Sequence, residues 1–503
     1  MTRSGEQYLE GLRDGRQVFI DGELVGDITR HPAFKGAVRS VAALYDTVDD
    51  KANRDQLTFA SPATGEPVSL AHLIPRSPAD LTRRRIGLKT MAEQTYGLMG
   101  RGPEHVAGFL AGFAGHSHVF AAGGEHFARN LEAFHAKARD EDLYMTYTIL
   151  PPQIDRSKPA HQQADPHLYA GVVAERDGGI VVRGAQMLGT GTAISDYVYL
   201  SNIAPLQPGD EAYALAAMVP VGAPGVKIYA RRSYAAASSS LFDYPVTARF
   251  DETDSLLVYD DVFVPWEHVF AYRNIDVVKR QWFATAGHVL GNNQAQIRFW
   301  TKLEFLIGLA HRVAQMNGSV NLPPVKGALG EMAAQVATVA GLVLAQEQHA
   351  TVDEHGVAWP GRAECFANMA LQPDLYAKLL VMIRDLCGGG LIQLPSSAND
   401  FANPAIAADV NRFVQSPGYP ATERVKLLKL VWDMVGSEFA SRHHQYEMFY
   451  AGAPFVVKMR MYDAYDFGAG SRLVDTMLAS YDLSGLRDTA LPPAGEALDP
   501  VRG

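Results

Sequence analysis

The spacing of apolar residues changes twice along the sequence, and these changes divide it into three parts. In the first and last parts, apolar residues recur every three or four positions, which predicts helices at 33–45, 77–99, 104–113, 123–140, 292–316, 327–349, 373–387 and 422–450. The middle part is rich in β-branched and aromatic residues and predicts strands at 143–150, 170–174, 180–183, 197–201, 213–220, 226–229 and 255–264, besides an early strand at 17–20. Long C-terminal helices with short connections indicate an antiparallel bundle.

The order of these elements predicts an α+β fold with four consecutive regions. We expect a helical N-terminal domain, a central β domain, a C-terminal helical bundle and an extended tail, over residues 1–140, 141–272, 273–480 and 481–503.

Composition and charge narrow the classes of protein to consider. The chain has 503 residues, of which 47% are hydrophobic and 20% charged, as in ordinary globular proteins. Its formal net charge of −10 argues against a nucleic-acid partner. The two cysteines, Cys365 and Cys387, predict neither a disulfide framework nor a cysteine metal site. With no apolar signal segment at the N-terminus and no evident membrane span, the expected location is the cytoplasm.

The segment from 143 to 159 carries an unusual density of polar groups at the end of a predicted strand. Pro151-Pro152 stops any strand ladder, because proline donates no backbone hydrogen bond. Gln153, Ile154, Asp155 and Arg156 follow directly. A solvated turn would account for them, but the segment also lies where helical and β-rich regions meet, and small-molecule sites concentrate between domains. We therefore predict a binding site there.

A second candidate lies in the turn Met99-Gly100-Arg101-Gly102-Pro103-Glu104-His105. Pro103 suits the first helical position, and the charge of Glu104 complements the helix dipole. Arg101 therefore precedes a helix N-terminus, between two glycines that allow other groups to approach closely. A surface loop charge is the alternative for Arg101.

Familiar catalytic and metal-binding patterns are missing from the sequence. It contains no HExxH, P-loop, GxSxG or CxxC motif, and Gly189-Thr190-Gly191-Thr192 has neither the spacing nor the βαβ context of a dinucleotide fingerprint. The group His349, Asp353, Glu354 and His355 reads as a solvated helix end rather than a metal site. No metal is therefore expected.

Several blocks resemble the 4-hydroxyphenylacetate 3-monooxygenase family of flavin-dependent aromatic hydroxylases. They are GEQYLEGLRDGR, HPAF, MGRGPEH, PPQIDR, FDYP, DDVFVPWEHV, LPSSAND and GSEFASRHHQYE, and they run almost from end to end. The resemblance implies an acyl-CoA-dehydrogenase-like fold with a central β-barrel and a C-terminal four-helix bundle, assembled as a homotetramer. It implies the oxygenase component of a two-component system, which hydroxylates a phenol with O2 through a C4a-hydroperoxide of FAD. A separate NAD(P)H-dependent reductase would supply the reduced FAD.

The resemblance also suggests roles for individual residues. Arg101 matches the arginine that holds the phenol oxygen. His105 and Tyr147 stand where the family has tyrosine and histidine, so this pair is exchanged. Ser201 and Asn202 match the grip on the far end of the substrate. The implied flavin contacts are Gln153, Ile154, Asp155, Arg156, Thr190, Arg442, His443, His444 and Gln445.

A base near the phenol would help, because a phenol is activated as its oxygen loses the proton. His105 and His288 are candidates, since the ordinary pKa of histidine is near neutral. If His105 is the base, the yield of hydroxylated product relative to wasted hydrogen peroxide should change with pH near neutrality. The segment HVLGNNQAQ around His288 resembles the branch that acts on halogenated or nitrated phenols, where the ring substituent is lost.

Two other classes of function stay open. One is a flavin-dependent enzyme similar to 4-hydroxybutyryl-CoA dehydratase, but Arg101 and His105 occupy the loop where that enzyme's iron–sulfur cysteines would be expected. The other is a non-catalytic helical scaffold, which turnover with phenols and a reductase would exclude.

Overall fold

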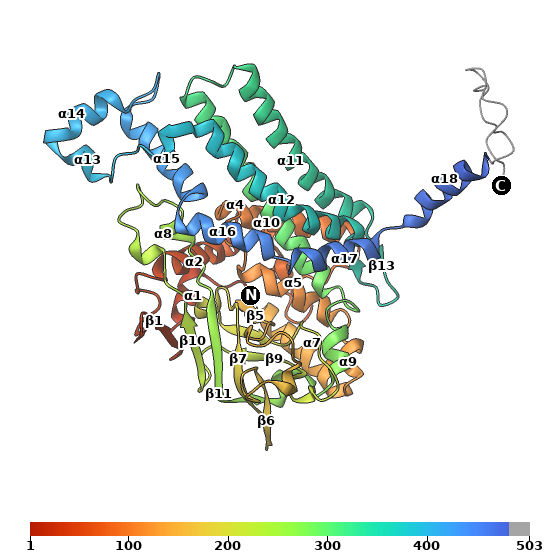
Figure 1. The fold of residues 1–503 in the computed structure, drawn as a ribbon. Coiled ribbons are helices and arrows are strands. Elements are labelled where there is room, and N and C mark those ends of the chain that lie inside the picture. The colour runs from red at the N-terminus through yellow and green to blue at the C-terminus, as the bar shows by residue number, and fades with distance from the viewer. Residues whose placement is uncertain (482–503) are drawn as a thin grey trace.

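The computed structural model describes residues 1–481 and builds the molecule from helices above and β-sheets below (Figure 1). Residues 482–503, most of the predicted tail, lie outside the described part. The N-terminal helices are α1 (Gly5–Gly11), α2 (Lys35–Asp49), α3 (Arg54–Leu57), α4 (Pro78–Gln94), α5 (Pro103–Ala114), α6 (His118–Ala121) and α7 (Glu125–Asp140), with a small hairpin of β3 (Thr58–Ala60) and β4 (Pro67–Ser69). The helices predicted in this region are thus confirmed.

The central β domain consists of two sheets. The six-stranded sheet has the order β2 (Glu23–Leu24), β1 (Gln17–Ile20), β10 (Val226–Ala230), β11 (Ser255–Pro265), β7 (Gly179–Gln186) and β6 (Gly171–Arg176). The four-stranded sheet has the order β12 (Val269–Tyr272), β9 (Leu215–Pro220), β8 (Tyr197–Leu200) and β5 (Met145–Thr148). A bridge between Leu150 and Met187 connects the end of β5 to the larger sheet, so the two sheets together form the expected barrel-like domain.

Two segments of the β domain were predicted from the sequence, although the sheet partner of the first strand was not. Asp177-Gly178-Gly179 forms the predicted hairpin turn between β6 and β7, with φ of 83° at Gly178, a conformation that favours glycine. The early strand β1 pairs with β10, so a segment from the N-terminal part contributes to the β-sheet. The proposed domain boundaries stay a prediction.

The C-terminal part is a helical bundle. Its helices are α10 (Gly287–Met316), α11 (Pro323–Gln348), α12 (Arg362–Cys387), α15 (Ala421–Val435) and α16 (Glu438–Phe449), preceded by α9 (Ile275–Arg280). The predicted helix over 422–450 is wrong in one respect, because Gly436 ends α15 and the Ser437 side chain caps α16. The helix predicted from residue 373 begins earlier, at Arg362, and contains Pro373.

Several smaller segments surround this bundle. A β13 (Thr351–Val352) and β14 (Ala358–Trp359) hairpin joins α11 to α12, and α8 (Thr247–Phe250) precedes β11. Helices α13 (Asn399–Ala402) and α14 (Pro404–Phe413) extend from one end of the bundle (Figure 1). Beyond α17 (Pro454–Ala464), helix α18 (Phe467–Ala479) stands clear of the body, and none of its residues is buried.

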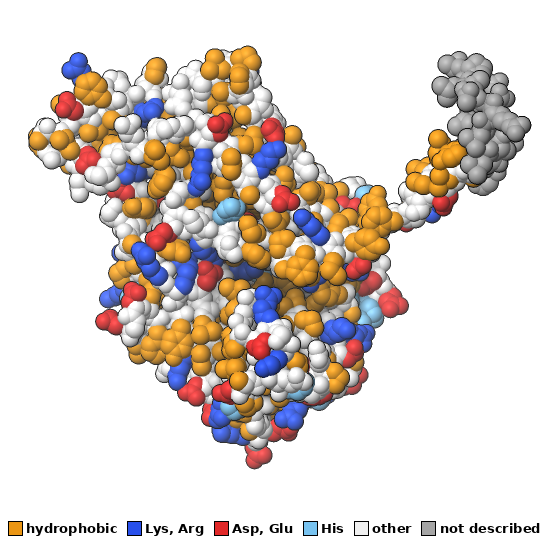
Figure 2. Space-filling view, viewed as in Figure 1, with side chains coloured by type: hydrophobic (Ala, Val, Ile, Leu, Met, Phe, Trp, Pro, Cys, Tyr) orange, Lys and Arg blue, Asp and Glu red, His pale blue; other side chains and the backbone are white. Residues whose placement is uncertain are grey.

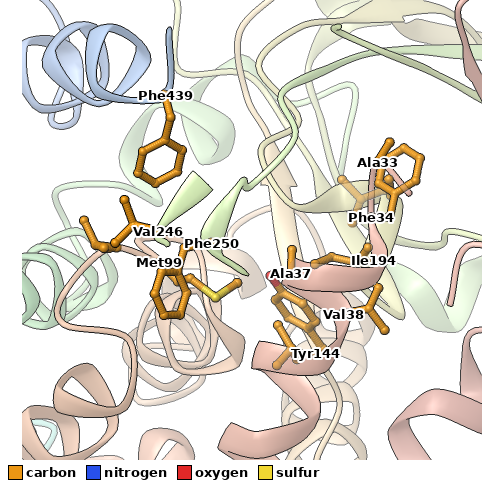
Figure 3. Close-up of a cluster of buried hydrophobic side chains, with 14 of the residues drawn as sticks. Ala33, Phe34, Ala37, Val38, Met99, Tyr144, Ile194, Val246, Phe250 and Phe439 are labelled. Carbon is orange, nitrogen blue, oxygen red and sulfur yellow. The ribbon is translucent and has the colours of Figure 1, made fainter. Parts of the chain in front are cut away.

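One hydrophobic cluster connects the three parts of the molecule. Tyr144 and Ile194 from the β domain lie beside Ala37 and Val38 of α2 (Figure 3). The same cluster includes Met99, Val246, Phe250 and Phe439. Since these residues come from all three parts, the loop that carries Arg101 is held between the β domain and the bundle.

Helix α11 is an exception among the bundle helices. By length and composition it is apolar enough to cross a membrane, although core helices of other proteins pass the same test. It packs against α10 and α12, yet only 22% of its most apolar window is buried. Most residues of that window are therefore exposed or half-buried in this chain.

Candidate active site

Arg101 is buried at the junction of the β domain and the bundle. Its guanidinium lies among three tyrosine rings, with Cζ 4.1 Å from the centroid of Tyr450, 5.1 Å from Tyr147 and 5.6 Å from Tyr446. Its backbone N–H donates to Glu252 Oε1 at 2.7 Å. Gly100 is required beside it, because an added Cβ would lie 2.3 Å from the Tyr446 hydroxyl. The alternative that Arg101 is a surface loop charge is wrong.

His105 follows one turn later on α5 and faces the same guanidinium. Arg101 Nη1 lies 2.8 Å from His105 Nε2, and Gln294 Oε1 lies 2.8 Å from His105 Nδ1. The His105 ring centroid is 5.6 Å from that of Tyr147, which in turn is 5.7 Å from Phe109. The structure thus brings Arg101, His105 and Tyr147 together, and each of the three side chains contacts at least one aromatic ring.

Thr190 and Arg442 meet through one carboxylate. Asp254 accepts from Thr190 Oγ1 at 2.7 Å and from Arg442 Nε and Nη2 at 2.9 and 2.6 Å. Burial would raise the pKa of Asp254, but the neighbouring guanidiniums of Arg442 and Arg231 hold it well below its usual range. Loop 189–192 and helix α16 are therefore connected by a charged, partly buried group.

This second group lies directly beside Arg101. An added Cβ at Gly191, whose φ is 75°, would lie 2.9 Å from the Tyr144 hydroxyl, which donates to the carbonyl of Arg101. Glu252 contacts both groups, because its other oxygen lies 3.7 Å from Arg442 Nη1. Glu252 therefore lies between Arg101 and Arg442, although the two arginines are far apart in the sequence.

The next residues of α16 point in different directions. His443 is buried, and Lys302 Nζ donates to its Nδ1 at 3.0 Å. His444 is half-buried with its ring 6.2 Å from Tyr376, whereas Gln445 is exposed. Burial, with Lys302 next, lowers the pKa of His443 well below its ordinary value. Its proton is therefore on Nε2, since an ammonium can only donate to Nδ1.

Segment 153–156 lies apart from this junction at the surface. Ile154 is 51% exposed, and Asp155 accepts from the backbone and hydroxyl of Ser157. Pro152 and Ile154 border a groove of about 380 Å³ over β7 and β11, with Leu256 and Val258 opposite. Within the described residues, none of the four predicted contacts is hydrogen-bonded to Thr190 or Arg442.

Ser201 and Asn202 are buried on the other side of an aromatic layer. Gln281 Nε2 donates to Ser201 Oγ at 2.8 Å, and Trp282 Nε1 donates to the carbonyl of Asn202 at 3.2 Å. The Trp282 ring lies 6.2 Å from Phe109, which contacts Tyr147. The two predicted substrate residues are thus connected to the Arg101 group through the rings of Trp282, Phe109 and Tyr147.

His288 does not join the group around Arg101. Its Nε2 lies 3.3 Å from Arg460 Nη1, and its ring packs on Phe283 and Phe366. Burial, with Arg460 next, lowers its pKa to about 3. Burial and Arg101 likewise lower the pKa of His105 well below its ordinary value. The expectation that either histidine titrates near neutral pH is wrong, because both are buried beside arginines.

Comparison with known proteins decides the family. The profiles of the 4-hydroxyphenylacetate 3-hydroxylase N-terminal and C-terminal domains match residues 4–271 and 278–479. The 4-hydroxyphenylacetate 3-monooxygenase oxygenase component of Pseudomonas aeruginosa is 34% identical over 96% of this chain and 94% of its own. The chain belongs to the 4-hydroxyphenylacetate 3-hydroxylase family. The 4-nitrophenol 2-monooxygenase oxygenase component of a Rhodococcus species is 33% identical, over 96% and 93% of the two chains.

Solved structures of this hydroxylase family share the fold. The oxygenase component of 4-hydroxyphenylacetate 3-monooxygenase, in complex with FAD and 4-hydroxyphenylacetate, is 32% identical with a TM-score of 0.89, over 95% of this chain and 98% of that one. An archaeal 4-hydroxybutyryl-CoA dehydratase, 21% identical with a TM-score of 0.87, covers 96% of both chains and shows the same fold alone. The predicted acyl-CoA-dehydrogenase-like order of helical, β and helical parts is confirmed.

The residues at the junction fit the flavin that a member of this hydroxylase family would take. Several buried polar atoms have no hydrogen-bond partner among the described residues: Arg442 Nη1, His443 Nε2, His444 Nε2, Tyr446 OH and Glu252 Oε2. Buried polar groups normally have partners, so these atoms are available to a ligand. Arg442 and the Nε2–H of His443 are donors, which suit the carbonyl oxygens and ring nitrogens of an isoalloxazine.

Sequence reasoning missed several residues of this hydroxylase site. Tyr450 donates to the carbonyl of Gly100 at 2.7 Å, and Gln294 donates to Glu104 at 2.9 Å. Glu447 binds Arg298 and Lys302 at the centre of the bundle. Glu447 and Tyr450 lie just beyond the predicted Arg442–Gln445 segment at helical spacing, which is the one signal that could have indicated them.

Proposed function

We propose that this protein is the oxygenase component of a two-component, FAD-dependent monooxygenase that hydroxylates a phenol with O2. The observation that carries this proposal is the buried Arg101. Its Nη1 lies 2.8 Å from His105 Nε2, and the carboxylate of Glu252 links it to Arg442, which binds Asp254 together with Thr190. A fixed cation beside an aromatic wall suits a phenolate, and the unpartnered atoms of α16 suit a flavin. The named activities of the relatives support this proposal.

The residues around Arg101 would hold and activate the phenol. The guanidinium donates to the phenol oxygen and stabilises the negative charge as the proton leaves, while Tyr147 and Phe109 lie against the aromatic ring. His105 is neutral and accepts at Nε2 from Arg101 Nη1, so it holds the guanidinium that would bind the phenol oxygen. Burial of the group excludes water and strengthens each of these interactions.

The flavin would be held on the α16 side of the same junction. Arg442 and His443 supply donors, Thr190 lies on the neighbouring loop, and Gln153 to Arg156 would reach it from the surface segment. When bound in its reduced form, FAD supplies the electrons that activate O2. The protein supplies position and exclusion of water, and the cofactor supplies the difficult chemistry.

Loss of a ring substituent is the second outcome that we consider for the same site. The feature that suggests it is the sequence segment HVLGNNQAQ around His288, whereas the Rhodococcus relative is named for oxygenation at position 2 of a phenol that carries its nitro group at position 4. A dehydratase of the 4-hydroxybutyryl-CoA type has less support. Its iron–sulfur chemistry needs thiolates, whereas the two cysteines, Cys365 and Cys387, are buried with raised pKa.

We further propose a cytoplasmic homotetramer that receives reduced FAD from a separate NAD(P)H-dependent reductase. Helix α18 stands clear of the body and carries hydrophobic side chains along it (Figure 2). Leu473, Val474, Met477 and Leu478 are each more than half exposed. An isolated helix of this length has marginal stability in water. We therefore propose that α18 and the exposed side of α11 pack against a second copy of the chain.

Substitutions in helix α18 test the proposed assembly directly. The double substitution Leu473→Asp and Met477→Asp is expected to reduce the molar mass measured by light scattering on a sizing column. Asp475→Asn, on the same helix, is the matched control and should keep the wild-type mass. A wild-type protein that runs as a monomer at micromolar concentration would contradict the proposed tetramer.

The proposed activity predicts how the purified protein behaves with cofactors. It should be mostly colourless and bind reduced FAD more tightly than oxidised FAD, because reduction is assigned to another protein. With FAD, a generic flavin reductase, NADH and a panel of phenols, mass spectrometry should detect a hydroxylated product. Direct NADH oxidation by the protein alone, or silence with every phenol, would count against the proposal.

A further inference from the structure

Four buried side chains form a continuous hydrogen-bond series that leads away from the phenol position. Arg101 Nη1 and His105 Nε2 are 2.8 Å apart, His105 Nδ1 and Gln294 Oε1 are 2.8 Å apart, and Gln294 Nε2 and Glu104 Oε1 are 2.9 Å apart. Glu104 is one residue before His105 on α5, and Gln294 reaches both of them from α10. The series therefore connects a carboxyl group to the arginine through a histidine.

The direction of every bond in the series follows from its arginine end. A guanidinium only donates, so His105 Nε2 accepts and the histidine proton is on Nδ1. Nδ1–H then donates to Gln294 Oε1, which leaves the amide N–H2 to donate to Glu104. All three bonds run toward Glu104, so the carboxyl group is the terminal acceptor of the series.

Glu104 is held in surroundings that oppose its charge. Burial is the main cause that raises its pKa from the ordinary value of 4.5 to about 7, and its Oε2 has no partner among the described residues. Charged and titratable groups face it from several elements, with Glu252 raising the pKa and Arg298 lowering it. The others are His105 on its own helix, Tyr144 before β5, and Tyr45, His72 and Asp142 around a small cavity beside it.

We propose that Glu104 is a positioning residue that controls the ionisation of the bound phenol, acting through Gln294 on His105. The inference rests on the proposed function, because it requires a phenol at Arg101 and His105. An ionised Glu104 polarises the amide of Gln294 and makes His105 Nε2 a stronger acceptor for Arg101 Nη1, which holds the guanidinium with its remaining N–H groups toward the phenol oxygen. A protonated Glu104 withdraws that support. Glu104 therefore acts on the phenol oxygen only through the position of Arg101, the last donor of the series.

The ionisation of a bound phenol can be measured without flavin. The ¹⁹F chemical shift of 4-fluorophenol differs between its neutral and ionised forms, and the protein contributes no fluorine signal. In wild type, the ionised fraction of bound 4-fluorophenol should rise in a step near the pKa of Glu104, about 7. Glu104→Gln and Gln294→Leu should both abolish this step and lower the ionised-to-neutral ratio about tenfold above it, equivalent to roughly one pKa unit.

Asp142→Asn is the matched control for these variants. Asp142 is also buried, its pKa is raised by burial to about 6, and it lines the same cavity, but it accepts from the backbone of Arg3 rather than from the series. The wild-type step should persist in this variant. Since the raised pKa of Glu104 means that its ionisation costs stability as pH rises from 4.5 to about 7, Glu104→Gln should melt at a higher temperature than wild type above that range.

The outcomes separate this inference from the proposed function. A wild-type step retained in Glu104→Gln, or lost equally in Asp142→Asn, overturns the role of Glu104 while leaving phenol binding intact. Failure of wild-type protein to bind 4-fluorophenol and every other phenol of the panel overturns the proposed function, and this inference with it.

Discussion

Replacing Arg101 with alanine is expected to lower kcat/KM for phenol hydroxylation by about 100-fold or more. The guanidinium is buried, and the side chain lies where negative charge develops on the phenol oxygen. Removing one such preorganised donor costs about 3 kcal/mol in other enzymes, which corresponds to roughly that factor. Steady-state product formation with a flavin reductase measures it. Binding of reduced FAD should change little, because Arg442 and Thr190 lie on the other side of Glu252.

The lysine variant separates charge from geometry at this position. Arg101→Lys keeps the positive charge but cannot reproduce two donors in one plane, so we expect about a tenfold loss or more, about 1.4 kcal/mol. Arg232→Lys is a suitable control, since Arg232 forms an exposed ion pair with Glu438. Undiminished hydroxylation by Arg101→Ala would end the assignment of Arg101 to the phenol.

Replacing Glu447 with glutamine is expected to destabilise the protein by about 3 kcal/mol or more. Glu447 Oε1 lies 2.8 Å from Lys302 Nζ, and Oε2 lies 2.8 Å from Arg298 Nη2, with all three side chains fully buried. Although burial alone would raise it, these two cations lower the pKa of Glu447 to about 2. Removing one partner of a buried ion pair leaves uncompensated charge in a low dielectric, which costs about 3 to 5 kcal/mol.

The pH dependence of this loss is a second signature. Burial lowers the pKa of Lys302 to about 8 in wild type, and removal of Glu447 should lower it further. The folded variant then binds fewer protons than the unfolded chain, so its stability rises with pH and the deficit shrinks toward pH 8. Urea unfolding at several pH values measures this effect. Glu438→Gln, at an exposed pair on the same helix, should change nothing measurable, and an equal effect there would contradict the explanation.

Much of the fold could be predicted because the chain has strong local signals. The hairpin at Asp177-Gly178-Gly179 and the helix begun by Pro103 depend on residues that are adjacent in the sequence. The break at Gly436 was missed because the apolar spacing continues across it, while the cap formed by Ser437 decides where α16 begins. The sequence predicts a helix start at Pro373, whereas packing of α12 against α10 and α16 accommodates this proline inside the helix.

Only the site residues that lie within continuous sequence motifs could be predicted. Arg101, His105 and Tyr147 were found through blocks of sequence, and the structure brings them together. Glu252 and Gln294 could not be found in that way, because each contacts the Arg101 loop from a distant segment. The protonation of His105 also depends on burial and on the neighbouring arginine, which no local pattern specifies.

A single-turnover reaction with ¹⁸O2 tests the central claim most directly. Protein loaded anaerobically with chemically reduced FAD and one phenol at a time is mixed with ¹⁸O2, so no reductase is needed. The account predicts one ¹⁸O atom in a new ring hydroxyl of at least one phenol, and the product mass also shows whether a ring substituent is kept or lost. Oxidation of the flavin with no labelled product from any phenol would contradict the account, and so would a labelled product formed in the same yield by Arg101→Ala as by wild type.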